Sequence, residues 1–76
     1  MIINLKQYKA MCAYKERVHG FLKDGYTVLF DYDDIALMYT KLRHRNGNIV
    51  TVSFSKTDGI LSQTTNGEET FSCTMY

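Results

Sequence analysis

The sequence lacks several features that define common protein classes. It has no proline in 76 residues and its charges are spread evenly, which argues against a disordered tail or linker. No apolar run approaches the ~20 residues that a helix needs to cross a bilayer, so we expect a protein with no membrane association. The net charge is +1, so overall charge favours neither nucleic acid nor an acidic substrate as the partner.

Cysteine is also scarce. Cys12 and Cys73 are the two cysteines and lie far apart in the sequence, whereas a disulfide-rich secreted scaffold would carry more. We interpret both as small buried apolar side chains. No signal peptide precedes the expected fold, so we expect a cytoplasmic protein, located in the host cytoplasm if a bacteriophage encodes it.

What the sequence does contain is enough apolar material for one core. Hydrophobic residues make up 45% of the chain, including six tyrosines and four phenylalanines. A chain of this length is near the lower limit for independent folding and buries about 60% of its unfolded surface. We therefore expect a single domain over residues 1–76.

The N-terminal part predicts an amphipathic helix over about residues 4–24. Its apolar residues recur at spacings of three and four, and lysine, arginine and glutamate occupy the remaining arc. Asn4 is a suitable N-cap with Gln7 as its partner in a capping box. Gly25 provides a C-terminal stop signal.

The rest of the chain predicts antiparallel strands at about 26–32, 35–45, 48–56, 60–65 and 68–75. Turn signals separate them: Asp33-Asp34, Asn46-Gly47, Thr57-Asp58-Gly59 and Asn66-Gly67. A two-residue turn at Asn46-Gly47 places Arg43 opposite Val50, and a similar turn at Asp33-Asp34 places Tyr32 opposite Ile35.

These alignments gather large apolar side chains on one face of the sheet. The expected architecture is α+β, with one N-terminal helix on one face of a four- to five-stranded antiparallel meander. The expected core face carries Tyr26, Val28, Phe30, Tyr32, Ile35, Leu37, Tyr39, Val50, Val52 and Phe54.

The opposite face predicts a surface for a protein partner. It holds Leu29, Met38, Leu42 and Ile49 among hydroxyl residues, and exposed apolar groups on a polar sheet mark binding surfaces. Asp33 and Asp34 add an acidic turn at one end. Aspartate is favoured there for turn chemistry alone, but the charge also helps to orient a charged partner.

A second hypothesis is nucleic-acid binding through the basic residues Lys41, Arg43, His44 and Arg45. A positive hairpin is well suited to phosphate contact. The aromatic residues needed for stacking on single strands are, however, assigned to the core face in this alignment.

A third hypothesis is a homo-oligomer joined through residues 70–76. This predicted edge strand has no charge and no proline, and such edges pair readily with another strand.

Catalysis is not expected. The sequence has no glycine-rich phosphate loop, no CxxC pair and no HExxH, and nothing places a serine or cysteine beside either histidine. We expect no catalytic residue, no metal site and no cofactor.

The working hypothesis is therefore a small non-enzymatic protein that binds a larger partner as an inhibitor, adaptor or regulator. No family motif is recognisable. In size, single domain and lack of catalytic residues, the chain resembles the small accessory proteins with which bacteriophages block a host enzyme, and that resemblance implies a protein partner.

Overall fold

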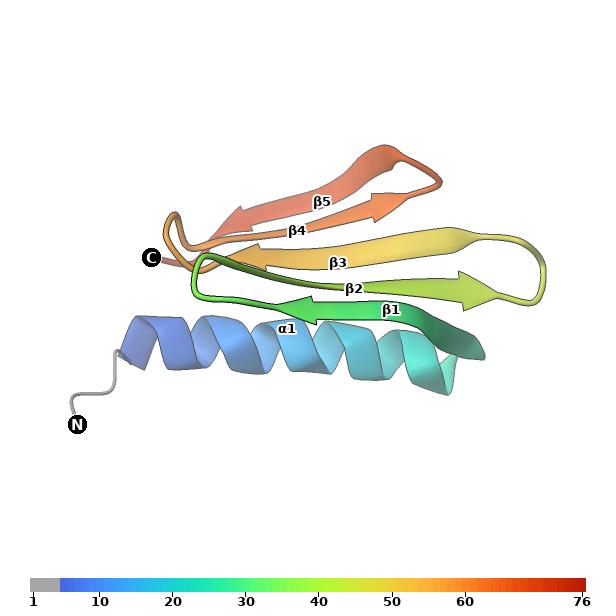
Figure 1. The fold of residues 1–76 in the computed structure, drawn as a ribbon, viewed down its shortest axis with the longest axis horizontal. Coiled ribbons are helices and arrows are strands. Elements are labelled where there is room, and N and C mark those ends of the chain that lie inside the picture. Colours follow the sequence, from blue (N-terminus) through green and yellow to red (C-terminus); the bar gives the residue numbers. More distant parts are fainter. Residues whose placement is uncertain (1–4) are drawn as a thin grey trace.

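The computed structural model describes residues 5–76 and shows one helix packed on one face of a five-stranded antiparallel sheet (Figure 1). The strands lie in chain order, so the sheet is a meander, and the predicted α+β architecture is confirmed. The predicted ranges lie within two residues of the observed ones at every described end. The elements are α1 (Leu5–Lys23), β1 (Tyr26–Asp33), β2 (Leu37–His44), β3 (Ile49–Ser55), β4 (Ile60–Thr65) and β5 (Glu68–Thr74).

Helix α1 ends as the sequence predicts. Gly25 follows the helix with a φ of 95°, a left-handed conformation in which glycine is unstrained. Its amide donates to the carbonyl of Leu22 at 3.2 Å, which satisfies one of the last helical carbonyls. The predicted N-cap, Asn4, lies outside the described residues.

The turn between β4 and β5 also follows the prediction. Asn66 and Gly67 both have positive φ, 53° and 87°, as a two-residue type I′ turn requires. Beyond this turn the register between β4 and β5 shifts by one residue. Thr64 pairs with Glu69, but the preceding residue, Gln63, pairs with Phe71, so Thr70 is the extra residue. The extra residue forms a bulge that the sequence pattern does not reveal.

The turn between β2 and β3 corrects the predicted register. Gly47 has a φ of 98°, but Asn46 does not have a positive φ, so the turn is not type I′. His44 donates to Asn48 and Gly47 donates to His44, both at 2.9 Å, which closes a three-residue loop. Arg43 therefore pairs with Ile49 and not, as predicted, with Val50.

The turn between β1 and β2 is also longer than predicted. The amide of Asp34 donates to the carbonyl of Leu37 at 2.9 Å, and Asp33 pairs with Met38. The predicted two-residue turn at Asp33-Asp34 is therefore wrong. Tyr32 pairs with Tyr39, four residues beyond its predicted partner Ile35. Because four is an even number, the residues of β1 and β2 that were predicted to share a face still do so in this region.

The pairing of β2 with β3 differs by one residue from the predicted register. As a result, the side chains of β1 and β2 that were predicted to lie on the core face lie on the opposite face, and the reverse. Val52 and Phe54 pair with Thr40 and Met38, so these residues share the face under α1. Tyr39, predicted to lie with them, is on the opposite side, next to Phe30 and Tyr32. The prediction that Phe30, Tyr32, Leu37 and Tyr39 share the core face with Phe54 is wrong.

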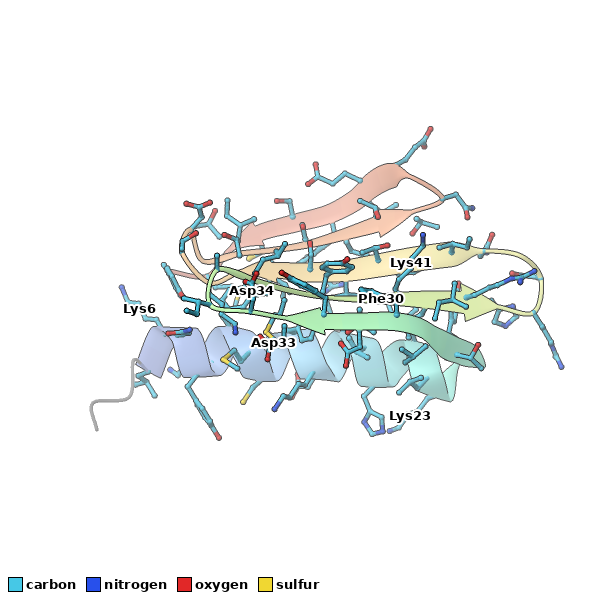
Figure 2. All side chains as sticks on the ribbon, viewed as in Figure 1. Lys6, Lys23, Phe30, Asp33, Asp34 and Lys41 are labelled. Atoms are coloured by element: carbon cyan, nitrogen blue, oxygen red, sulfur yellow. The ribbon has the colours of Figure 1, made fainter. Side chains whose placement is uncertain are left out.

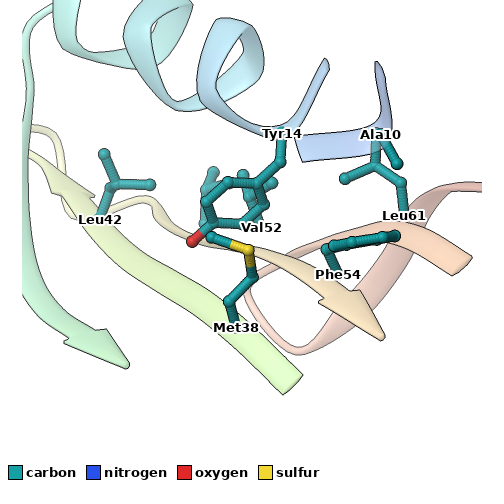
Figure 3. Packing of buried hydrophobic residues seen from close by; sticks show 8 residues of the cluster. Ala10, Tyr14, Met38, Leu42, Val52, Phe54 and Leu61 are labelled. Atoms are coloured by element: carbon teal, nitrogen blue, oxygen red, sulfur yellow. The ribbon is translucent and has the colours of Figure 1, made fainter. Parts of the chain in front are cut away.

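The core lies between α1 and the centre of the sheet. Ala10 is fully buried, and its small side chain lets the helix backbone approach the strands, while Tyr14 extends down between Met38 and Val52 (Figure 3). Leu42, Val52 and Phe54 have no exposed surface. The buried cluster comprises Ala10, Tyr14, Met38, Leu42, Val50, Val52, Phe54 and Leu61.

Arg17 connects α1 to β4 and β5, the strands farthest from β1. Its guanidinium carbon lies 3.5 Å from the centre of the Phe71 ring, and its Nη1 donates to Oε1 of Gln63 at 2.7 Å. Cation–π contacts of this kind contribute about 0.5–2 kcal/mol. The helix therefore contacts β4 and β5 through this side chain as well as the central strands.

The observed register predicts which side chain of β2 matters for stability. Leu42→Ala should lower the free energy of unfolding by about 2–5 kcal/mol, because it removes a fully buried side chain and leaves a cavity. Urea unfolding followed by circular dichroism measures this change. The neighbouring exposed residue is the control, since Lys41→Ala should change stability by less than about 0.5 kcal/mol. Similar losses in both variants would contradict the register.

Candidate functional site

The face of the sheet opposite α1, here called the open face, carries the aromatic side chains of the first hairpin. Phe30 and Tyr32 come from β1 and Tyr39 from β2, and we call these three residues the aromatic ladder. Figure 2 shows Phe30 and Lys41 pointing away from α1, whereas Asp33 lies toward it. The aromatic ladder was assigned to the core from the sequence, so this surface was missed.

The rings of the aromatic ladder pack on one another. The centroids of Tyr32 and Tyr39 are 5.2 Å apart with an interplanar angle of 27°. Those of Phe30 and Tyr39 are 5.9 Å apart at 35°. Phe30 remains 51% exposed and Tyr32 38% exposed. The ladder therefore combines fixed ring positions with large accessible apolar surface.

The remainder of the open face is mainly hydroxyl-bearing. Tyr39 pairs with Ser53, which pairs in turn with Ser62, and the hydroxyls of the two serines are 2.8 Å apart. One row further along the strands, Lys41 pairs with Thr51 and Thr51 with Thr64. The open face thus changes from aromatic over β1 and β2 to polar over β3 and β4.

Two basic residues share the open face with the aromatic ladder. Lys41 pairs directly with Phe30, and Arg43 follows two residues later on the same side of β2. Both are exposed. Of the predicted basic cluster, Lys41 therefore lies beside an exposed aromatic ring and Arg43 lies on the same face. The sequence had indicated that the aromatic residues would be in the core and not available for stacking.

The other members of the basic cluster are placed differently. Arg45 is exposed in the turn after β2. His44 lies on the helix side, where its ring is 5.0 Å from that of Tyr26, and its Nδ1 accepts a hydrogen bond from the amide of Asn46 at 3.2 Å. A hollow of about 240 Å³ near the turn is lined by Gly25, Thr27, Arg43, His44 and Arg45.

Two residues nominated for protein binding cannot form an accessible surface. Met38 is 7% exposed and Leu42 is fully buried, because the corrected register turns both toward α1. Their expected place on the open face is therefore wrong. A charge introduced at Met38 would disrupt the core rather than test a binding surface.

The other nominated residues lie at the surface. Leu29 occupies the bulge of β1, where the pairing shifts between Val28 and Phe30, and is half exposed. Ile49 is half-buried on the open face opposite Arg43. The acidic residues that were nominated with them are both exposed at the β1–β2 turn.

Asp34 organises the turn at the end of β1. Its Oδ1 accepts hydrogen bonds from the amides of Ala36 and Leu37 at 2.8 and 2.9 Å, and its Oδ2 accepts one from the hydroxyl of Tyr32 at 2.5 Å. These donors, Tyr32 first, hold the pKa of Asp34 below its ordinary value. The same hydrogen bond raises the pKa of Tyr32. Asp34 therefore joins the turn to the aromatic ladder.

Lys56, the first residue after β3, contacts the same turn. Its Nζ lies 2.5 Å from Oδ1 of Asp33 and donates to the carbonyl of Asp34 at 2.6 Å. Asp33 is largely exposed, so we assign the pair a modest energetic contribution. Within residues 5–76 it is the only ion pair.

A chain of polar groups crosses the helix side of β1 and β2. The hydroxyls of Tyr14 and Thr40 are hydrogen bonded, and the hydroxyl of Thr40 donates to Oδ1 of Asp31 at 3.0 Å. Burial raises the pKa of Tyr14, although the hydrogen bond to Thr40 opposes this shift. The chain satisfies the buried polar groups of the core, so we interpret it as structural.

The predicted pairing segment, residues 70–76, is only partly an edge strand. Strand β5 ends at Thr74. Beyond it, the amide of Met75 donates to the carbonyl of Gly59 and the hydroxyl of Tyr76 to that of Lys56, both at 2.7 Å. These bonds hold the last two residues against the β3–β4 turn.

In the part of the chain that the structure describes, there is neither a cluster of metal-binding side chains nor a helix that could span a membrane. Among residues 5–76, no three His, Cys, Asp or Glu side chains are grouped closely enough to hold a metal ion. Helix α1, the helix of the described residues, is not long and apolar enough to cross a membrane. Cys12 and Cys73 are half-buried free thiols.

The fold and site define a class, an α+β domain with one helix-covered face and one open, aromatic face. No protein-family model matches the chain, and no curated protein or solved structure is significantly similar to it. Function is therefore inferred from the surface of the protein itself.

The hydrogen bonds of Asp34 predict a pH effect on stability. Because its pKa is lowered in the folded state, the carboxylate stabilises the fold above the unfolded pKa of about 4, and this contribution is lost as pH falls through the folded value. Asp34→Asn should flatten the acid limb between about pH 5 and pH 2, and Tyr32→Phe should flatten it in part. Urea midpoints across this range measure the slope; an unchanged slope in Asp34→Asn would contradict the assignment.

Proposed function

We propose that the protein is a small non-catalytic binding module that docks a protein partner through the open face of its sheet, as an inhibitor, adaptor or regulator. The observation that supports this most directly is the exposure of the aromatic ladder. Exposed tyrosine and phenylalanine side chains on an uncovered face are typical anchors of protein interfaces, because they bury large areas with few rotatable bonds.

Exposed aliphatic residues extend the same surface. Ile35, at the β1–β2 turn, is 94% exposed, and Leu37, on the same face of β2 as Tyr39, is 37% exposed. Small monomeric proteins rarely keep apolar groups contiguous at the surface unless these contact something. Aliphatic side chains gain little from phosphate or sugar, so this extension favours a protein partner.

The surface is also preorganised. The rings are carried by paired strands, and the turn beside them is fixed by Asp34 and Lys56. A contact surface that is ordered before binding loses less conformational entropy in the complex. The structure thus provides the rigidity that a small inhibitor or adaptor needs.

Paired capture experiments test this proposal. The wild-type protein and the Phe30→Ser, Tyr39→Ser double variant are used as bait in lysate of the source cell. A partner that depends on two anchors should be depleted by about tenfold or more in the double variant. The control variant, Lys6→Ala with Lys9→Ala, alters exposed residues of α1, away from the open face, and should retain the partner.

The double variant must remain folded, as circular dichroism and the thermal midpoint will show. Tyr39 is half-buried, so the single Phe30→Ser variant, at the exposed edge, serves if the double variant unfolds. Full retention of the partner by a folded variant would refute docking through the open face.

Single-stranded nucleic acid is the second candidate, favoured by the position of Lys41 beside Phe30. Base stacking on an aromatic ring with a nearby cation for the phosphate is the usual arrangement of single-strand binders. A hollow of about 390 Å³ next to Lys41 is lined by Ile49, Thr51, Thr64, Asn66 and Gly67. The face has few cations, however, and this makes a protein partner the better proposal.

The second candidate predicts a salt-dependent interaction. A fluorescent twelve-residue oligothymidylate should bind, and the Arg43→Ala, Arg45→Ala variant should lose affinity and reduce the slope of log K against log salt by about 1.4, at about 0.7 per phosphate contact. Lys6→Ala with Lys9→Ala removes equal charge from α1 and should have little effect. Absence of binding at low salt would eliminate this candidate.

A further inference from the structure

The outer edge of β1 alternates in chemistry and has no strand partner among residues 5–76. Within this described part of the chain, β1 is the first strand of the sheet and pairs only with β2. Along its regular part the sequence reads Phe30, Asp31, Tyr32, Asp33, so aromatic and acidic residues alternate. Because neighbouring residues of a strand point to opposite faces, the edge is aromatic on the open face and acidic on the helix side.

We propose that the partner adds an extended strand to this edge, in which apolar residues alternate with lysine or arginine. The inference rests on the proposed function, because the apolar side chains of the added strand would pack against Phe30 and Tyr32 on the open face. Its basic side chains would lie on the helix side, next to Asp31 and Asp33. Main-chain hydrogen bonds supply affinity in such complexes, and the alternating side chains supply specificity.

Two observations on the helix side of β1 support a basic residue in the added strand. Asp31 accepts one hydrogen bond, from Thr40, and forms no ion pair with any residue of 5–76. A groove of about 330 Å³ opens between α1 and the sheet beside it, which gives space for a long side chain. The groove is lined by residues that include Tyr14, Lys15, Val18, His19, Asp31 and Asp33.

The groove is not purely acidic, and this sharpens the inference. Lys15 and His19 enter it from α1, and Asp33 is already paired with Lys56. A guest cation therefore relies mainly on Asp31 and is repelled by Lys15. Removing the charge of Lys15 should strengthen binding of a basic strand, an effect that non-specific apolar contact would not produce.

A second copy of this chain is a poorer occupant of the edge. An antiparallel register that sets Tyr32 opposite Phe30 or Tyr32 of the other copy also sets Asp31 opposite Asp31 or Asp33. The register that sets Phe30 opposite Phe30 places Asp31 opposite Leu29, where the bulge interrupts regular pairing. Like charges directly opposite one another destabilise strand pairs. The bulge near Leu29 further limits regular pairing to the residues from Phe30 onward. The edge therefore favours a different, basic strand.

A synthetic peptide tests the inference: acetyl-Thr-Val-Lys-Val-Lys-Val-Thr-amide, titrated into the full chain and followed by isothermal calorimetry and by amide NMR. The expected result is binding with shift changes and exchange protection concentrated in β1. The matched peptide with glutamate in place of lysine should bind at least about fivefold more weakly, as should a peptide N-methylated on alternate residues.

Variants of the protein locate the contact. Asp31→Asn, which retains an acceptor for Thr40, should weaken the lysine peptide about fivefold, and Lys15→Gln should strengthen it by a similar factor. Glu68→Gln, on the opposite edge strand, is the matched control and should leave affinity unchanged. If Asp31→Asn fails to fold, Lys15→Gln and the glutamate peptide carry the test.

Three outcomes would overturn the inference: equal binding of the lysine and glutamate peptides, no effect of N-methylation, or protection in β5 instead of β1. If the peptide fails while the Phe30→Ser, Tyr39→Ser variant still loses a captured protein, the edge inference fails and docking through the open face survives. If the peptide binds β1 while that variant retains its partner, the proposed docking fails and the edge site survives.

Discussion

The pairing of Leu42 with Val50 is the constraint on which the rest of the structure depends. It places the apolar residues of β2 and β3 on the same face, under α1, where Ala10 and Tyr14 cover them. Because side chains alternate along a strand, the same pairing sends Tyr39 and Lys41 to the other face. Burial of the core and exposure of the aromatic ladder are therefore two results of one register.

The aromatic ladder has a structural role in addition to the recognition role that we propose for it. Cross-strand aromatic pairs stabilise a hairpin by about 0.5–1.5 kcal/mol beyond the area they bury. The Tyr32–Tyr39 pair joins the edge strand to β2 on the side that α1 does not cover. The rings thus hold β1 in place while they remain exposed, so the proposed docking surface is already ordered in the free protein.

The sequence predicted the elements and their order well, because helix periodicity and turn residues are local signals. It failed at the register, since Asn-Gly is compatible with both a two-residue and a three-residue loop. Charge could have decided between the two loop lengths. Tyr39, Lys41 and Arg43 lie on the same face of β2, so a register that places Tyr39 in the core also buries two cations. The bulges in β1 and β5 have no comparable signal, because they depend on packing across the sheet.

The candidate site follows the same logic as the fold. In β1 and β2 the acidic residues Asp31 and Asp33 lie on the helix side, and the basic residues Lys41 and Arg43 lie on the open side. Thr40 bridges Asp31 to the buried Tyr14, so the carboxylate is positioned by the core itself. In the proposed complex, a carboxylate positioned in this way beside the outer edge of β1 favours a basic guest strand over an acidic one, so that a small sheet without a deep cavity selects its partner by charge.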